Sequence, residues 1–262
     1  MSISSSDSGW RCWATVVEDA GLGLNPNGWV LGIDTSSDVA SLALVPLADH
    51  EVFGAEISWE AARNQTATLL AEIDHLCRLT GIESDDFAAV VVATGPGGFN
   101  ALRVGMSVAK GFAFAGNIPI VGVGTLDIAA HAVANWGLPV RAFIPAGRRR
   151  VVYADFRHSN GALVPQGAIA NRESSELAAD LLAPTVLTGD LSVADERALR
   201  EMPNVVLPGA GTRRRRASVM IDLALPRLLA GEADDLTTLE PLYLHQQRPE
   251  LVAGRTGSDS TS

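Results

Sequence analysis

Hydrophobic positions in the first half of the chain predict three strands in succession, followed by alternating helices and strands. Strand-length apolar runs end at turn residues, whereas the helices carry apolar residues three or four positions apart, as at Leu69, Ile73 and Leu76. Alternation after the third strand implies parallel strands joined by crossover helices. The elements expected here are strands at Trp29–Asp34, Val39–Val45, Val52–Trp59, Ala88–Ala93 and Ile118–Val123, and helices at Glu60–Thr80, Leu102–Ala115 and Leu126–Trp136.

The second half predicts a similar order of strands and helices, but less clearly, and shows no strict sequence repeat. A degenerate duplication of the first half would give two lobes. We therefore predict an α/β chain with the actin-like ATPase (ribonuclease-H-like) fold, in which mixed sheets are flanked by helices. The elements expected are strands at Val140–Ile144, Val151–Phe156, Thr185–Thr188 and Asn204–Leu207, and helices at Glu173–Leu182, Asp195–Met202 and Arg215–Ala230.

Composition shifts along the chain predict four regions. A Ser-rich start and a Gly/Asn-containing stretch indicate a flexible N-terminal extension over 1–28. The N-terminal ribonuclease-H-like lobe is expected over 29–126 and the C-terminal lobe over 127–247. The Gly/Ser/Thr-rich end, 248–262, is expected to be disordered.

Charge and cysteine content narrow the function classes. The net charge of −10 over 262 residues disfavours nonspecific nucleic-acid binding by the whole surface. Two cysteines, Cys12 and Cys77, are too few for a disulfide framework and suit a reducing compartment. No run approaches the roughly 18 apolar residues that a membrane span needs. We expect a soluble cytoplasmic protein with no membrane partner.

The segment Thr94–Met106 joins a predicted strand to a predicted helix through three glycines and a proline. Such a bend carries few side chains to crowd a neighbour. Its backbone N–H groups can receive a phosphate, another protein can pack there, or the glycines can allow the helix to pack on its own strand. These three interpretations stay open, and Gly116 is expected to cap the helix in the left-handed conformation.

Four stretches resemble the TsaB (YeaZ) family, the smaller actin-like paralogue in bacterial threonylcarbamoyladenosine synthesis on tRNA. Leu31–Leu44 is similar to the family's opening strand, turn and strand, and Gly95–Phe114 is similar to its G-P-G-S-F-T-G-x-R-x-G segment. Pro119–Leu126 resembles the strand and turn that follow, and Pro241–Leu244 the C-terminal P-x-Y-L piece. The resemblance is continuous from about Trp29 to Thr125 and sparse beyond.

The chain departs from the family pattern at several positions. Gly98, Asn100 and Ala101 replace Ser, Thr and Gly in the glycine segment, and Gln65 stands where many members carry a histidine. Arg148–Arg150 replaces the family's D-A-R-x-G-E-V-Y approach to the second-lobe strand. These departures concern contact details and partner choice rather than the fold.

The resemblance implies a non-catalytic subunit that pairs with a larger, catalytic TsaD-type paralogue and enables modification of the adenosine beside the tRNA anticodon. It further implies a TsaE-type ATPase in the complex, tRNA contacted through the complex, and a homodimer when the paralogue is absent. In the family, the first two helices of the N-terminal lobe form the pairing surface. The candidates on this chain are Asn64, Gln65, Thr68, Phe99, Asn100, Arg103 and Ser107.

The catalytic groups of the larger paralogue have no counterpart in this sequence. That paralogue holds a metal with an H-x-x-x-H pair, and no two histidines here are spaced as a helical ligand pair. A G-x-S-x-G nucleophile elbow is also missing. We expect no catalytic residue, no metal and no cofactor. The histidines are His50, His75, His131, His158 and His245.

An active actin-fold ATPase or kinase is the alternative, with Asp34, Thr35 and Ser36 at the nucleotide and Asp34 holding hydrated magnesium. The turn lacks the glycine that such phosphate loops usually carry, and Asp and Ser are ordinary turn formers, so a plain turn is favoured. A metallopeptidase is a weaker alternative.

Two arginine runs, Arg148–Arg150 and Arg213–Arg216, are interpreted first as solvated turns in an acidic protein. Contact with the tRNA backbone is the other interpretation, because guanidinium groups match phosphates. Four adjacent arginines at a helix start oppose the helix dipole, which calls for a compensating anion.

Overall fold

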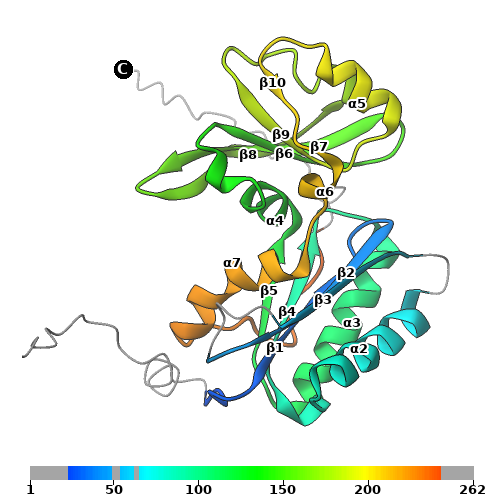
Figure 1. Ribbon diagram of the computed structural model, residues 1–262, viewed down its shortest axis with the longest axis vertical. Helices are drawn as coiled ribbons and strands as arrows, with labels where there is room; N and C mark the ends of the chain where they lie inside the picture. Colours follow the sequence, from blue (N-terminus) through cyan, green and yellow to red (C-terminus); the bar gives the residue numbers. More distant parts are fainter. Residues whose placement is uncertain (1–22, 49–53, 62–64, 243–262) are drawn as a thin grey trace, which may run out of the picture.

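The computed structural model describes residues 23–48, 54–61 and 65–242, which form two lobes stacked one above the other (Figure 1). The sheet of the first lobe has β1 antiparallel to β2 and β2 antiparallel to β3, whereas β4 and β5 run parallel to β1. The predicted tail lies outside the described residues, as does most of the predicted N-terminal extension. The strands across this sheet are β3 (Ala55–Glu60), β2 (Val39–Pro46), β1 (Trp29–Asp34), β4 (Phe87–Gly95) and β5 (Ile120–Gly124).

The second sheet repeats this connectivity. Three antiparallel strands come first in the chain, and two parallel strands follow on the other side of the first of them. The predicted duplication and the predicted actin-like α/β fold are confirmed, although the two halves share no strict sequence repeat. The strands across this sheet are β10 (Val205–Val206), β9 (Thr185–Gly189), β6 (Val140–Pro145), β7 (Arg150–Ser159) and β8 (Ala162–Glu173).

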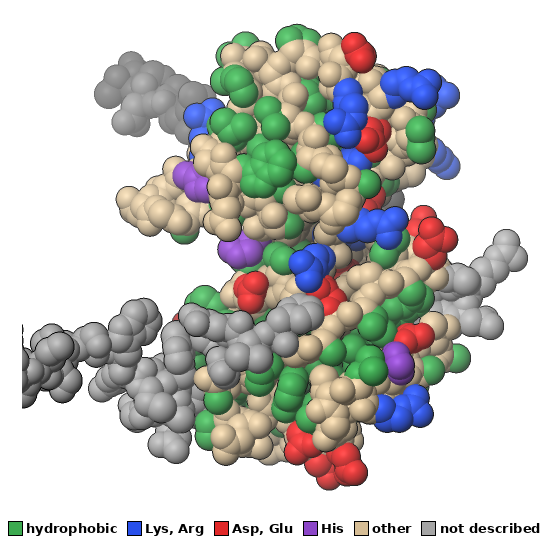
Figure 2. Space-filling view, viewed as in Figure 1, with side chains coloured by type: hydrophobic (Ala, Val, Ile, Leu, Met, Phe, Trp, Pro, Cys, Tyr) green, Lys and Arg blue, Asp and Glu red, His purple; other side chains and the backbone are tan. Residues whose placement is uncertain are grey.

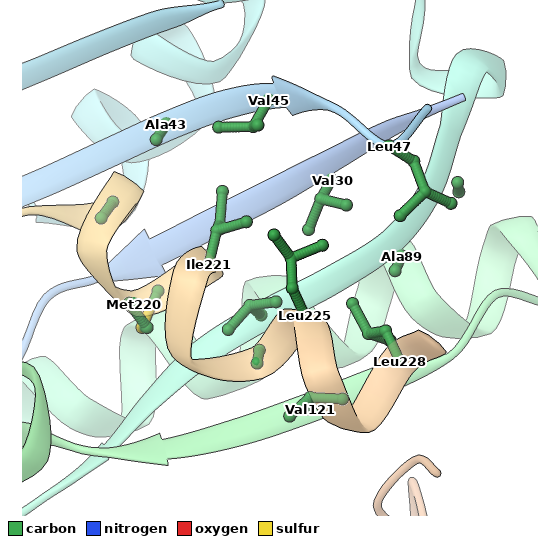
Figure 3. Close-up of a cluster of buried hydrophobic side chains, with 14 of the residues drawn as sticks. Val30, Ala43, Val45, Leu47, Ala89, Val121, Met220, Ile221, Leu225 and Leu228 are labelled. Carbon is green, nitrogen blue, oxygen red and sulfur yellow. The ribbon is translucent and has the colours of Figure 1, made fainter. Parts of the chain in front are cut away.

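Helices cover both faces of the first sheet (Figure 1). Helices α2 (Gln65–Thr80) and α3 (Phe99–Gly116) bury their apolar stripes on one face, as the hydrophobic spacing predicted. Helix α7 (Ala217–Leu229) covers the opposite face, where its side chains pack against β1, β2, β4 and β5 (Figure 3). This helix falls within 127–247, the range expected for the C-terminal lobe, but it packs on the sheet of the first lobe. The division at residues 126 and 127 stays a prediction.

The second sheet is also covered on both faces. Helix α4 (Thr125–His131) packs on one face, on the side toward the first lobe, and α5 (Val193–Arg200) packs near the other. The short helix α6 (Ala210–Arg213) lies where the chain crosses back to the first lobe (Figure 1). Single turns of 3₁₀ helix occur at Ser84–Asp86, Ala134–Trp136 and Ser174–Glu176.

The predicted helix at Glu173–Leu182 is wrong. Strand β8 occupies the chain up to Glu173, and only a 3₁₀ turn follows. Arginine side chains bond to carbonyls of this turn, since Arg172 donates to the Glu176 carbonyl, which also accepts from the Ala179 N–H, and Arg141 donates to that of Leu177. Strand β8 contains Pro165, which it tolerates because it lies at the edge of the sheet.

Several predicted helix ends differ from those observed. Helix α2 begins at Gln65, whereas the expected first residue, Glu60, belongs to β3. Helix α4 ends at His131, earlier than the expected Trp136, and a separate 3₁₀ turn follows. The left-handed cap of α3 is Asn117, with φ of 48°, whereas Gly116 is the last helical residue. Asparagine tolerates this conformation better than most residues with a side chain.

Candidate functional site

The turn after β1, where a nucleotide was the alternative prediction, is buried. Asp34, Thr35 and Ser36 are each less than 5% exposed. The Asp34 carboxylate accepts hydrogen bonds from the backbone N–H of Ser36 at 2.8 Å and from its hydroxyl at 2.5 Å, both at Oδ1. This is the bonding of a turn-forming aspartate, the role that the sequence favoured.

The glycine segment before α3 packs directly on this turn. The N–H of Gly98 donates to the Ser36 carbonyl at 2.8 Å, and the Thr35 hydroxyl donates to the Ala101 carbonyl at 2.6 Å. A Cβ on Gly97 would lie 2.3 Å from the Ser36 carbonyl oxygen, so any side chain there would collide with backbone. Of the three interpretations of the glycines, close internal packing is the one that these distances support.

A buried arginine faces Asp34 from the crossing between the lobes. Arg215, 6% exposed, donates from Nε to Asp34 Oδ2 at 3.1 Å and from Nη1 to Asp190 at 2.9 Å. Its Nη2 donates to the Ser36 hydroxyl at 3.2 Å. Burial works against its charge, but the two carboxylates outweigh burial and raise the pKa of Arg215, so the guanidinium stays charged.

The residues of this turn do not fit a hydrated magnesium ion. Such an ion would need a carboxylate oxygen at the end of the first strand, and both oxygens of Asp34 already accept hydrogen bonds. A guanidinium occupies the cation position beside the carboxylate. A positive charge next to Arg215 would also be repelled.

Above this turn, the two lobes enclose a cleft, which we call the interlobe cleft. Its volume is 490 Å³, and a neighbouring hollow of 440 Å³ shares Asp38, Pro145, Asp190 and Leu191 with it. Basic and acidic side chains face each other where the lobes meet (Figure 2). The cleft is large enough for a nucleotide-sized molecule.

The two arginine runs both reach the interlobe cleft and its neighbouring hollow. Arg213 and Arg214 line the cleft, and Arg148–Arg150 lines the hollow. The interpretation of the second run as a solvated turn is wrong for Arg213 and Arg215, which are buried, since buried and exposed residues alternate from Arg213 at the end of α6 to Arg216. The compensating anions are Glu196 for Arg213, Asp34 and Asp190 for Arg215, and Glu56 for Arg216.

The sequence reasoning missed Asp190, Glu196 and Arg215 as individual members of this site. Asp190 follows Gly189 at the end of β9, a position that a strand-end Gly-Asp pair could have marked. The run of four arginines indicated that anions must compensate its charge. The sequence could not show which carboxylate pairs with which arginine, because these partners come from other elements of the fold.

The predicted pairing residues lie on α2 and α3, which contact each other on the outer face of the first sheet. Asn64 lies outside the described residues, and Gln65 begins α2. Thr68 is half-buried, whereas Asn100 and Ser107 are exposed. The Arg103 guanidinium lies 4.1 Å from the centre of the Phe99 ring, which is itself 51% exposed. These residues stay predictions for an interface.

The same two helices carry exposed apolar side chains. Four of the eight exposed large hydrophobic residues among the described residues lie on α2 and α3. A groove between these helices is lined by Leu70, Ile73 and Phe112. Apolar surface of this kind is typical of a protein-binding face. The four exposed residues are Leu70, Leu79, Phe99 and Phe114.

The described histidines are spread over the molecule. His75 lies on α2, His131 on α4 and His158 on β7, all exposed. Within the described ranges, no group of three or more His, Cys, Asp or Glu side chains is placed to hold a metal ion. None of the helices in those ranges has the length and apolarity that crossing a membrane demands.

Known structures share this architecture. Two Pseudomonas aeruginosa structures, YeaZ and a protein with similarity to peptidase YEAZ, superpose with a TM-score of 0.69 at 23% sequence identity. Each superposition covers 83% of this chain and 99% or more of the other. The protein therefore has the two-lobed fold of these YeaZ structures, as the resemblance implied.

Sequence comparison gives the family. A model of the TsaD family, tRNA N6-adenosine threonylcarbamoyltransferase, matches residues 49–181, and this chain belongs to that family. The transferase of Geobacter sulfurreducens is 37% identical over 40% of this chain, and that of Bacillus subtilis 34% identical over 41%. In both cases 34% of the relative is covered, so the chain spans about a third of the length of these curated relatives.

Proposed function

We propose that this protein is a non-catalytic subunit for N6-threonylcarbamoyladenosine modification of tRNA and acts by pairing with a larger, catalytic TsaD-type member of its family. The observation that carries the proposal is membership of that family without the H-x-x-x-H pair of the larger member. Loss of the metal ligands with retention of the fold favours a role in binding over a role in chemistry.

The proposed pairing surface is the outer face of α2 and α3. Its exposed leucine and phenylalanine side chains would be removed from water in a complex, which favours association. Phe99 and Arg103, stacked at the start of α3, are suited to a central contact because aromatic and arginine side chains often dominate binding energy. The same surface would form a homodimer when the paralogue is absent.

Further partners follow from the proposed reaction. A TsaE-type ATPase would belong to the complex, and tRNA would be contacted through the complex in the cytoplasm. The buried state of Asp34 and its ion pair with Arg215 argue against the alternative of an ATPase that uses Asp34, Thr35 and Ser36.

The pairing proposal is tested by mixing the purified chain with the larger paralogue and following the complex by gel filtration. We expect one co-eluting complex, and Phe99→Asp should weaken it at least about tenfold because it places a charge in the apolar contact. Leu182→Asp is the matched control, since Leu182 is 96% exposed and lies on the second lobe.

Failure to associate in the presence of nucleotide and tRNA would contradict the pairing proposal. Magnesium-dependent ATP hydrolysis by the isolated chain, abolished by Asp34→Ala, would instead support the ATPase alternative.

A further inference from the structure

Arg213 lines the interlobe cleft and has side-chain nitrogens without a hydrogen-bond acceptor in the ranges that the structure describes. Its side chain is buried, and one nitrogen, Nη2, donates to Glu196 at 2.6 Å. The other two nitrogens, Nε and Nη1, find no acceptor in the described part of the chain. Buried donors without acceptors cost free energy and are rare in native proteins. An anion seated against this wall could supply the missing acceptors after a small turn of the side chain.

Three further arginines surround the same space. Arg214 is exposed in the cleft, and Arg148 and Arg149 are exposed in the neighbouring hollow. Among the described residues, the side chains of these three arginines have no hydrogen-bond or ion-pair partner, although the Arg149 carbonyl accepts from the Ser174 N–H. The hairpin that carries Arg148 and Arg149 is held by bonds from Ala146 N–H to the Arg150 carbonyl and from Arg150 N–H to that of Gly147.

The start of α3 adds a second positive feature. Gly98 and Ala101 line the cleft, so the first turn of this 18-residue helix opens into it. The N-cap is Gly98 and has no side chain to satisfy the first N–H groups. Such a helix start attracts an anion through its free N–H groups and its dipole.

Two acidic side chains of the cleft are neutralised by arginines of the protein itself. Asp190 pairs with Arg215, and Glu196 pairs with Arg213 and Arg200. Asp195 in the neighbouring hollow accepts from Ser192 at 2.6 Å. Asp38 and Asp195 are the carboxylates lining the two spaces that have no cationic partner among the described residues, and the side chains of Arg148, Arg149 and Arg214 have no anionic partner there.

We propose that the interlobe cleft is a binding site for phosphate groups that works without a divalent cation. The guanidinium groups of Arg213 and Arg214 and the start of α3 would hold the phosphates, and Arg148 and Arg149 would extend the contact. Arg215 fills the cation position beside Asp34 from within the chain, so a metal ion is neither needed nor accommodated. This proposal does not rest on the proposed pairing function.

Two sources can supply this chemistry, a free nucleotide or the phosphodiester backbone of RNA, and one titration distinguishes them. The isolated full-length chain, in buffer with EDTA, is titrated calorimetrically with pyrophosphate, ATP and a short RNA hairpin. We expect pyrophosphate to bind with EDTA present and magnesium not to tighten it. ATP binding without RNA binding assigns the site to a nucleotide. RNA that competes with pyrophosphate assigns it to the backbone.

Single substitutions of exposed arginines test the site without disturbing the core. Arg214→Ala should weaken pyrophosphate binding about tenfold, the usual effect of losing a hydrogen bond to a charged group. Arg149→Ala should weaken it less. Arg157→Ala, an exposed arginine on β7 outside the cleft, should leave it unchanged.

Three results would overturn the proposal: no binding of any of the three ligands at millimolar concentration, binding that requires magnesium, or equal binding by Arg214→Ala and the unaltered chain. The pairing proposal would stand in each of these cases, because it depends on α2 and α3.

Discussion

Two glycines of α3 meet very different surroundings. A Cβ on Gly105 would lie 2.3 Å from Thr35 Oγ1, the hydroxyl that donates to the Ala101 carbonyl. A Cβ on Gly111, two turns further along the helix, would have no atom within 4 Å. The first glycine is therefore required by the packing of α3 on the buried turn, whereas the second only weakens the helix.

Alanine at these positions should have opposite effects on stability. Gly111→Ala should raise the free energy of unfolding by about 0.5–1 kcal/mol, the difference in helix propensity. Gly105→Ala should lower it by about 1–3 kcal/mol, because the Thr35 hydroxyl must leave its acceptor in a packed site. Urea denaturation of both variants checks this. Equal stabilisation by both would show that the turn does not press on α3.

Helix α7 completes the core of a sheet that lies far from it in sequence. Its Ile221, Leu225 and Leu228 point at the first sheet, among the buried side chains of β1, β2, β4 and β5 (Figure 3). The chain thus leaves the first lobe, builds the second sheet and returns to close the first. We expect loss of α7 packing to destabilise the first sheet although the helix follows the second.

A Leu→Ala substitution at a buried and at an exposed leucine measures how much the packing of α7 stabilises the protein. Leu228→Ala should cost about 2–5 kcal/mol, because Leu228 is fully buried and its removal leaves a cavity. Leu182→Ala should change the free energy of unfolding by less than about 0.5 kcal/mol, since Leu182 is almost fully exposed. Thermal unfolding would contradict the proposed role of α7 if both variants melted together.

Ion pairs, as well as the polypeptide chain itself, link the two lobes. Arg215 links Asp34, at the end of a strand of the first sheet, to Asp190, which follows a strand of the second. Arg216 reaches Glu56 on β3, while Arg213 reaches Glu196 on α5. The crossing segment therefore places arginines in ion pairs with both lobes, and these pairs fix how the lobes lie relative to each other.

Removing Arg215 should be costly because it leaves Asp34 buried without a counter-charge. Arg215→Ala is expected to lower the free energy of unfolding by about 3–5 kcal/mol, the usual loss when one partner of a buried pair is removed. Arg214→Ala, the exposed neighbour, should cost less than about 0.5 kcal/mol in the absence of ligand.

A second substitution separates this charge effect from lost packing. Asp34→Asn in the Arg215→Ala background should recover part of the stability, since the orphaned charge is gone. Denaturant unfolding of the unaltered chain, the single variants Arg215→Ala and Asp34→Asn, and the double variant gives the coupling energy. A coupling near zero would mean that the ion pair does not hold the lobes.

The hydrophobic pattern of the chain was enough to predict the fold class, most strands and the helices α2, α3 and α7, because apolar periodicity reports directly which face of an element is buried. It was also enough to mark Asp34 as a turn former. It failed at Glu173–Leu182, where a strand ends in a 3₁₀ turn whose carbonyls also accept from Arg141 and Arg172, and on the alternating burial of Arg213–Arg216. Those outcomes depend on side-chain contacts that the tertiary structure alone decides. The clearest case is the closing of the Asp34 turn by Arg215, because these residues are 181 positions apart and meet only in the folded chain.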